Sequence, residues 1–161
     1  MIRRARPADG ATLDRLQSAL SEPNPDLLAA ALAEVSGRST PTDRPTLSSF
    51  DLFVAVEAGA VVGYLLAVRG APTHVAEVVV DADHRRQGHG RALFDRLFTV
   101  VAERRDDDEG APSVRLAVSP DDHDARVFYR SLGFEASGHD PDYYDGAPAL
   151  LLVKPVDGES A

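Results

Sequence analysis

Residues 78–97, VVVDADHRRQGHGRALFDRL, join an apolar strand to an amphipathic helix through a short turn rich in arginine and glycine. The helix carries apolar side chains at helical spacing: Phe94, Leu97, Phe98 and Val101. A strand–turn–helix junction leaves unpaired N–H groups at the positive end of the helix. The pattern predicts a helix packed against a sheet, and the glycine turn (residues 85–90) binds an anion, closes a tight corner or only links the two elements.

Two common phosphate-binding motifs do not fit the glycine turn. A P-loop needs Lys and then Ser or Thr after its last glycine, whereas Gly90 is followed by Arg91. The dinucleotide fingerprint needs a third small residue, and Leu93 stands there. These two kinds of nucleotide site are therefore excluded.

The bare chemistry of the turn still favours a pyrophosphate. Glycine at positions 88 and 90 lets backbone amides approach a ligand closely, since no Cβ intervenes. The side chains of Arg85, Arg86 and Arg91 add positive charge beside the helix terminus. The alternative is a tight corner with solvated arginines.

The composition excludes several classes of protein. The chain of 161 residues has 17 basic and 26 acidic residues, and the net charge of −9 disfavours nucleic acid and anionic lipid as partners. It has no cysteine, so disulfides and thiolate chemistry are excluded. No apolar run is long enough for a signal peptide or a bilayer span. We expect a single cytoplasmic domain over residues 1–161 without contact to a membrane.

The order of predicted elements is β α α β β β α β α β β. Before the glycine turn the patterns predict a first strand in residues 2–9 ending at Pro7, helices over 10–22 and 23–38, a loop over 39–50, a hairpin over 51–68 turning at Glu57–Ala60, and a central strand over 74–80. Asp26 is the predicted N-cap of the second helix and Gly37 its stop.

After the glycine turn the patterns predict a helix ending in a turn near 104–110, a strand over 113–119, a helix over 122–134 and two strands around a loop over 138–147. The helix over 122–134 should turn four side chains inward and end at Gly133, the four being Ala125, Phe128, Tyr129 and Leu132.

Three segments resemble the GNAT acyltransferases, a family that binds acetyl-CoA. RRQGHGRAL resembles the signature R/Q-x-x-G-x-G/A, with Arg85 at the first position and Gly88 and Gly90 at the small positions. VVVDADHR is similar to the preceding L-x-V-x-P-x-x-R, with Ala82 in place of proline. ARVFYRSLGF resembles A-x-x-L-Y-x-x-x-G-F, with Tyr129 at the family tyrosine.

The resemblance implies an α/β (α+β) fold: a mixed, mostly antiparallel seven-stranded sheet, flanked by about four helices, with splayed central parallel strands. It implies acetyl-CoA as co-substrate, with the pyrophosphate on the amides of residues 86–91 and the pantetheine along the strand before them. The implied donor-binding residues are Val78, Val79, Val80, Arg85, Arg86, Gln87, Gly88, His89, Gly90, Arg91, Asp122 and Phe128.

Acetyl transfer to an amine needs a proton acceptor, an oxyanion donor and a proton for the leaving thiolate. The family match assigns the last role to Tyr129, for which helical spacing alone favours a core tyrosine. The oxyanion donor would be a backbone N–H near Val80. Glu77 is the candidate base and His74 the second candidate; the alternatives are a rim carboxylate that orients a cationic acceptor and an exposed histidine.

Two departures from family patterns bear on the site. Asp122 stands where the family usually has asparagine, which puts one pantetheine contact in doubt. The tail DPDYYDGAPALLLVK resembles that of ribosomal-protein alanine N-acetyltransferases, but Ala117 stands at the position of their glutamate base. That acceptor class is therefore one option among several.

The acceptor itself is not readable from the sequence. It would be selected by the second helix and the loops 39–50 and 138–147, where an acidic and tyrosine-rich group forms either a polar lip or a solvated loop: Asp140, Asp142, Tyr143, Tyr144 and Asp145. No metal site is expected, because the histidines and acids lack ligand spacing. A homodimer agrees with the resemblance, although no interface is specified.

We predict an acetyl-CoA-dependent N-acetyltransferase acting on a primary amine, either a small molecule or a protein N-terminus, by direct transfer in a ternary complex. The competing reading is a non-catalytic acyl-CoA-binding or sensor module.

Overall fold

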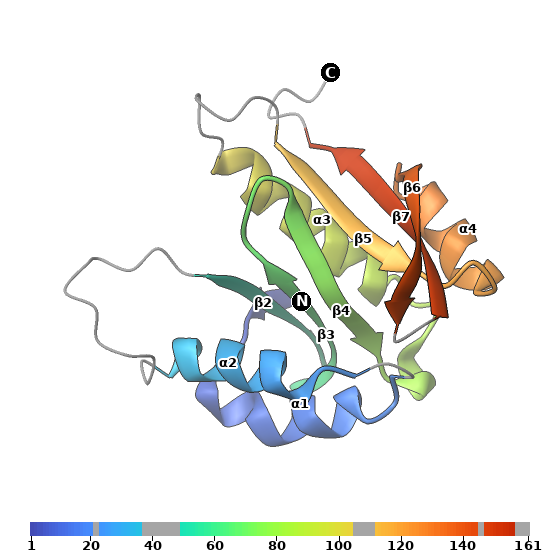
Figure 1. The fold of residues 1–161 in the computed structure, drawn as a ribbon. Helices are drawn as coiled ribbons and strands as arrows, with labels where there is room; N and C mark the ends of the chain where they lie inside the picture. The colour runs from blue at the N-terminus through green and yellow to red at the C-terminus, as the bar shows by residue number, and fades with distance from the viewer. Residues whose placement is uncertain (21–22, 37–48, 105–111, 145–146, 157–161) are drawn as a thin grey trace. The chain divides into compact units, whose positions relative to one another are not determined.

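The structure is a computed structural model, which describes residues 1–20, 23–36, 49–104, 112–144 and 147–156 (Figure 1). In these ranges the elements follow the predicted order, with two short 3₁₀ helices added. They are β1 (Ile2–Arg4), η1 (Pro7–Asp9), α1 (Gly10–Gln17), α2 (Pro25–Val35), β2 (Phe50–Glu57), β3 (Ala60–Val68), β4 (Thr73–Val80), η2 (Ala82–His84), α3 (His89–Glu103), β5 (Ser113–Val118), α4 (His123–Ser131), β6 (Glu135–Tyr144) and β7 (Ala147–Pro155).

The strands form a seven-stranded sheet in the order β1-β2-β3-β4-β5-β7-β6. The pairs β1–β2, β2–β3, β5–β7 and β6–β7 are antiparallel, whereas β4 and β5 run parallel. A parallel pair needs a long crossover, and α3 lies in the connection between these two strands. The predicted fold class and the central position of β4 are both confirmed.

The chain divides into two compact units. The first contains Met1–Arg69 and Glu77–Leu97, and the second contains Gly70–Ala76 and Phe98–Ala161. β4 and α3 contribute residues to both. The expected single domain over the whole chain stays a prediction.

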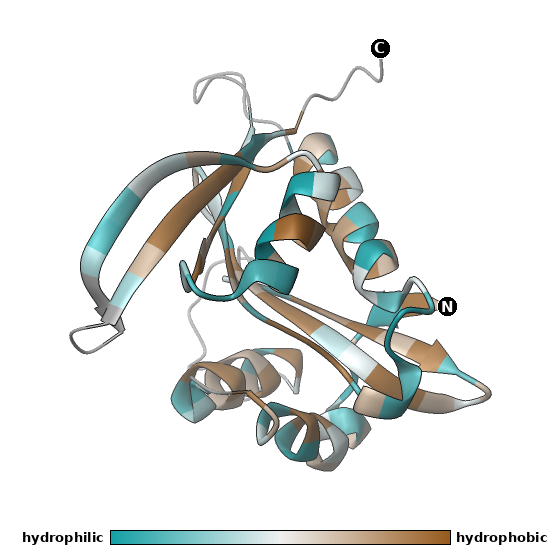
Figure 2. Ribbon diagram, turned by 90° about the vertical axis from the view of Figure 1, so that its right-hand side faces the viewer, coloured by the Kyte–Doolittle hydropathy of each residue, from teal (hydrophilic) through white to brown (hydrophobic). Residues whose placement is uncertain are grey.

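The β2–β3 hairpin of the first unit turns through Ala58 and Gly59, where the sequence predicts it. Their φ angles are 51° and 82°, and Glu57 pairs with Ala60 across the turn. Two positive φ angles are the mark of the tight turn whose twist matches that of the flanking strands. Hydrophobic residues dominate both strands (Figure 2).

The two N-terminal helices are shorter than predicted. α1 ends at Gln17, so Leu20 lies beyond it, while Leu13 and Leu16 are buried as their spacing indicates. The predicted N-cap of α2 is wrong. Asn24, not Asp26, caps this helix, because its side chain accepts a hydrogen bond from the N–H of Leu27 at 3.2 Å.

The central strand β4 alternates strictly between buried and partly exposed side chains. Thr73, Val75, Glu77 and Val79 are each at most 5% exposed, and the residues between them are intermediate. The run is nearly continuous in apolar residues, and its acidic residue, Glu77, occupies one of the buried positions. That carboxylate belongs to the first unit.

In the second unit, β6 occupies most of the predicted loop over 138–147, and that expectation is wrong. The pairs Asp140–Ala149 and Tyr144–Ala147 carry the β6–β7 ladder through it, with irregularities that absorb the extra residues. Gly133 follows α4 with φ +100°, as a helix stop should.

Several predicted features lie outside the described residues: the helix stop at Gly37, most of the loop over 39–50, most of the turn near 104–110, and Asp145. None of the helices that the structure describes combines the length and the hydrophobicity needed to cross a bilayer.

Gly63 in β3 offers a test of the packing between β3 and β4. A Cβ added there would lie 2.7 Å from the carbonyl oxygen of Val79 and 3.3 Å from the Cα of Val80, and neither backbone atom can move cheaply. We expect Gly63→Ala to lower the free energy of unfolding by about 1–3 kcal/mol, measured by urea denaturation.

Gly10→Ala is the matched control, since its Cβ would meet only Leu32 Cδ1 at 3.8 Å in ordinary contact. Equal stability of the two variants would contradict the close strand approach.

Candidate functional site

The glycine turn follows β4 through η2. The carboxylate of Asp81 accepts a hydrogen bond from the N–H of Asp83 at 3.3 Å and caps η2. The chain then passes the arginines and enters α3 at His89, where the carbonyl of Gly88 accepts the first helical bond from Ala92 at 3.0 Å. The predicted strand–turn–helix junction is thus present.

Two residues of the glycine turn have left-handed backbone angles. Gly88 has φ +86°, which glycine adopts without cost, and Arg86 has φ +63°, which side chains disfavour. Residues 85–88 are exposed. Since the first N–H groups of a helix have no acceptor within it, the start of α3 offers donors to an outside anion.

The charges at the turn fit a phosphate group. Arg86 and Arg91 are exposed on either side of Gly88. Arg85 also braces the turn, since its Nε donates to the carbonyl of Val80 at 3.2 Å. Amides at a helix start together with guanidinium groups make the donor set that a pyrophosphate needs.

Val78–Val80, the expected pantetheine strand, belong to the first unit, with Val79 buried and its two neighbours partly exposed. In the second unit, the described register of β4 with β5 consists of the pairs Thr73–Val114 and His74–Arg115.

Glu77, the candidate base, is 5% exposed and lies in a buried hydrogen-bond network. Gln17 Nε2 donates to both carboxylate oxygens, at 2.9 and 3.1 Å. The hydroxyl of Tyr64 donates to Oε1 at 2.9 Å, and the backbone N–H of Asn24 donates to Oε2 at 2.8 Å. α1, the start of α2 and β3 therefore all bind one carboxylate.

Tyr64 is fully buried. Burial raises the pKa of its hydroxyl far above the usual range, and the nearby charge of Glu77 raises it further. The hydroxyl therefore stays protonated and acts as a donor.

Sequence reasoning did not single out Gln17, Asn24 or Tyr64. Gln17 did carry a signal, because it follows the buried Leu13 at i+4 and so lies on the same face of the helix. A polar residue inside an apolar stripe indicates a buried partner. Asn24 binds through its backbone, and no sequence pattern announces that contact.

His74, the second candidate base, is partly exposed in the second unit. Burial lowers the pKa of its imidazole, and the charge of Arg115 lowers it further. His74 is therefore held in the neutral form that a proton acceptor requires.

α4 places Asp122, Phe128 and Tyr129 in the second unit. The carboxylate of Asp122 caps the helix by accepting from the N–H of Ala125 at 3.1 Å. The ring of Tyr129 lies 5.5 Å from that of Phe128 and 5.9 Å from that of Phe134. These rings orient the tyrosine.

The predicted inward face of α4 is only partly buried. Leu132 is 7% exposed, whereas Ala125, Phe128 and Tyr129 are intermediate. The aromatic side chains on this face thus retain access to solvent.

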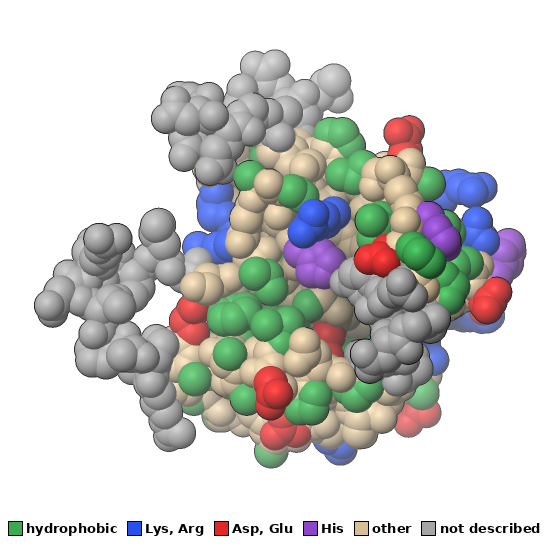
Figure 3. Space-filling view, viewed as in Figure 1, with side chains coloured by type: hydrophobic (Ala, Val, Ile, Leu, Met, Phe, Trp, Pro, Cys, Tyr) green, Lys and Arg blue, Asp and Glu red, His purple; other side chains and the backbone are tan. Residues whose placement is uncertain are grey.

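The structure gives little information on the regions expected to select the acceptor. The side chains of residues 142–147 lie outside the described set. Hydrophobic side chains gather around α2, another of these regions (Figure 3). Among described residues no three His, Asp or Glu side chains are grouped as metal ligands.

The arrangement defines a class: a mixed-sheet protein with an arginine- and glycine-rich turn between its central strand and the following helix. Residues 48–136 match the family model for an acetyltransferase (GNAT) domain. The chain belongs to the GNAT family, which confirms the resemblance seen in the sequence.

Known proteins of this family share sequence or fold with the chain. Mycothiol acetyltransferase of Brachybacterium faecium is 37% identical over 101 residues, which cover 60% of this chain and 30% of that protein. The ribosomal-protein-S18-alanine N-acetyltransferase of Escherichia coli has a similar structure, with TM-score 0.76 and 21% identity over 99% of this chain and 96% of that one.

Arabidopsis thaliana Naa50, solved with the bisubstrate analogue CoA-Ac-MVNAL, is similar at TM-score 0.74 and 17% identity over 96% of this chain and 97% of that one. The chain spans 31% and 30% of the lengths of two curated relatives that it matches.

The buried network predicts a stability effect. Tyr64→Phe removes one donor to a buried charge without changing the ring, so we expect the free energy of unfolding to fall by about 1.5–3 kcal/mol. Chemical denaturation measures it. Ser18→Ala, which removes an exposed hydroxyl bonded to Arg15, should change stability by less than about 0.5 kcal/mol. A loss that small in Tyr64→Phe would contradict the network.

Proposed function

We propose that this chain is an acetyl-CoA-dependent N-acetyltransferase that acts on a primary amine of a small molecule or a protein N-terminus. The observation that carries the proposal is the glycine turn, which combines two left-handed residues, the start of α3 and exposed arginines. The names of its relatives, a mycothiol acetyltransferase and a ribosomal protein bS18-alanine N-acetyltransferase, support a small-molecule acceptor and a protein acceptor, respectively.

In this proposal the pyrophosphate of the donor binds the amides of residues 86–91, and Arg85, Arg86 and Arg91 balance its charge. The pantetheine arm pairs with the backbone of Val78–Val80 in the manner of an added strand. Asp122 and Phe128 contribute at α4. The solved Naa50 complex with an analogue that contains CoA supports this class of donor.

The donor supplies an acetyl thioester, and the chain supplies proton donors and orientation. The amine nitrogen attacks the thioester carbon directly, the C–S bond breaks, and the leaving thiolate takes a proton. No covalent enzyme intermediate is expected, because the chain has no cysteine and its sequence shows no Ser–His pairing.

Tyr129 is the proposed acid. A phenol with an ordinary pKa of about 10 is protonated at neutral pH and can donate to a thiolate. Its partial exposure and the rings of Phe128 and Phe134 that orient it support this role.

Glu77 is the proposed base, but the hydrogen bonds around its carboxylate limit when it can accept a proton. A carboxylate has about four acceptor positions, and the bonds from Gln17, Tyr64 and Asn24 fill them. Glu77 can accept a proton from the acceptor amine only if one of these donors withdraws.

That condition favours a second candidate function, a non-catalytic acyl-CoA-binding module. In such a protein Glu77 anchors the helices and takes no proton. Position 117 supports the same function, because this chain has alanine there, whereas the ribosomal-protein alanine N-acetyltransferases that its tail resembles would have a glutamate base.

The two functions separate in one experiment. Acetyl-CoA binding is measured by calorimetry, and thiol release is then followed across amines that include amino sugars, amino-acid amides and peptides with free N-termini. The enzyme predicts amine-dependent release for at least one compound. Tight binding with no release for any compound supports the sensor, and no binding refutes both.

Tyr129→Phe tests the acid. The variant keeps the ring contacts but loses the proton, so we expect kcat to fall about 100-fold while the Kd for acetyl-CoA changes little. Val127→Ala, at a 53% exposed position on the same helix, is the control and should keep full activity. Equal kcat in the phenylalanine variant would assign the proton to another group.

Glu77→Gln tests the base. Loss of a general base should lower kcat about 100-fold or more while the Kd for acetyl-CoA changes little. Tyr64→Phe is the matched control, since it removes a donor but keeps the carboxylate, and should retain kcat if Glu77 accepts the proton. An unchanged kcat in Glu77→Gln would restrict Glu77 to its anchoring role.

A further inference from the structure

Glu57 stands at the tip of the β2–β3 hairpin, outside the site described so far. It is the last residue of β2, directly before the two left-handed residues Ala58 and Gly59. Its side chain is 43% exposed, so the direction of the carboxylate is set by its contacts and not by burial.

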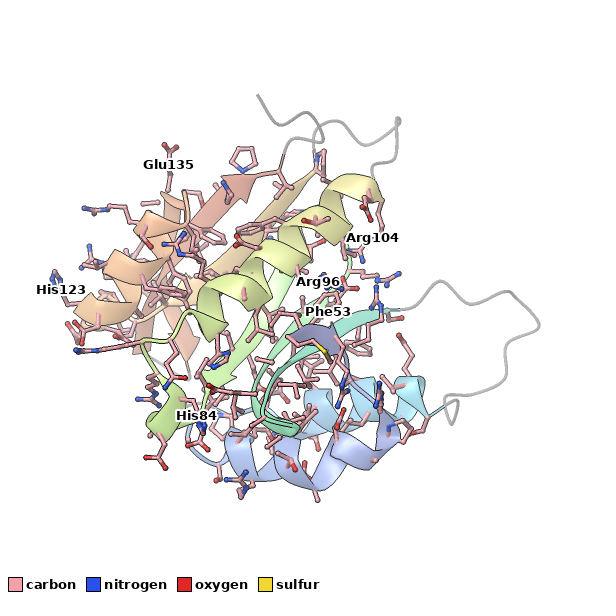
Figure 4. The ribbon with its side chains drawn as sticks, turned by 180° about the vertical axis from the view of Figure 1, so that it is seen from behind. Phe53, His84, Arg96, Arg104, His123 and Glu135 are labelled. Atoms are coloured by element: carbon pink, nitrogen blue, oxygen red, sulfur yellow. The ribbon has the colours of Figure 1, made fainter. Side chains whose placement is uncertain are left out.

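The carboxylate reaches two histidines, one directly before the glycine turn and one near its end. Glu57 Oε2 lies 3.1 Å from Nε2 of His89, the first residue of α3. It also lies 3.7 Å from Nε2 of His84, the last residue of η2, which is labelled in Figure 4. The two imidazole rings meet edge to face, with centroids 6.4 Å apart.

These three residues, the Glu57 cluster, hold both ends of the turn. Asp81 closes the other side of His84, with its Oδ2 3.9 Å from Nδ1. The side chain of His89 is 13% exposed, so it is packed rather than solvated. Between the two histidines the backbone makes its costly left-handed step at Arg86.

A left-handed backbone conformation is unfavourable for a residue other than glycine and persists only where the surroundings fix it. The contacts of the Glu57 cluster join His84 and His89 to the tip of the β2–β3 hairpin, and the bond from Arg85 Nε to the carbonyl of Val80 joins the start of the turn to β4. They keep the ends in place before any ligand binds.

Glu57 cannot favour donor binding by direct charge attraction to the pyrophosphate. A carboxylate close to an anion-binding turn repels a pyrophosphate, so on electrostatic grounds its removal should tighten donor binding. Its position next to both histidines instead indicates a role in shaping the turn.

The geometry points to Glu57 as a positioning residue for donor binding: through His84 and His89 it fixes the glycine turn in the shape that receives the pyrophosphate of acetyl-CoA. This inference rests on the proposed function and adds a residue from the hairpin, which the family motifs do not include.

The test compares acetyl-CoA with S-acetylpantetheine, which lacks the pyrophosphate. We expect Glu57→Ala to lower kcat/KM for acetyl-CoA about three- to ten-fold through KM, with kcat unchanged at saturation. The kcat/KM of Glu57→Ala for S-acetylpantetheine should equal that of the wild type, because this donor has no pyrophosphate for the turn to bind. Circular dichroism confirms that the variant is folded.

Two controls separate shape from charge. Glu57→Gln keeps an oxygen that accepts a hydrogen bond from Nε2 of His89, so it should restore most of the affinity. Asp83→Ala removes an exposed acid of the same region without touching the histidines and should not weaken binding. Opposite signs for Glu57→Ala and Asp83→Ala exclude a general effect of charge.

The outcomes distinguish this inference from the proposed function. If the wild type uses acetyl-CoA no better than S-acetylpantetheine, the pyrophosphate site itself is refuted. If the wild type prefers acetyl-CoA and Glu57→Ala keeps that preference in full, the positioning role is refuted. Equal losses with both donors would also overturn it, because they would place the effect outside the turn.

Discussion

The buried carboxylate of Glu77 is the interaction on which the first unit depends. It sits on the central strand and accepts hydrogen bonds from the end of α1, the start of α2 and the middle of β3. A buried charge is tolerable only when it is fully hydrogen-bonded, so these elements must meet at one point. The residue next to Glu77 begins the strand proposed for pantetheine. The group that holds the helices therefore also fixes the strand from which the glycine turn starts.

Much of the fold could be predicted because its signals are local. The hairpin tip follows from the Ala-Gly pair between two apolar runs, and α3 follows from the stripe through Phe94 and Leu97. Errors arose where a tertiary contact decided the outcome. Asn24 displaced Asp26 as the cap of α2. The polar run before Tyr144 became strand, because pairing with β7 outweighs its turn-like composition.

The candidate site divides in the same way. The glycine turn and Tyr129 were found because they are short contiguous patterns. The donors to Glu77 and the partners of Glu57 were not, since residues 60 and 32 positions away in the chain meet these carboxylates. Periodicity assigns a residue to a face, but it does not identify the residue that faces it across the fold. Roles that depend on such pairs need coordinates.

The β2–β3 hairpin has a consequence for how this chain can vary. A hairpin tip is normally a place where insertions are tolerated, because little depends on it. Side chains along β2 alternate with a period of two, so one extra residue within the strand ahead of Glu57 would turn this side chain to the opposite face. The histidines would then lose their acceptor. The length of β2 up to the hairpin tip is thus tied to the shape of a turn more than twenty residues downstream.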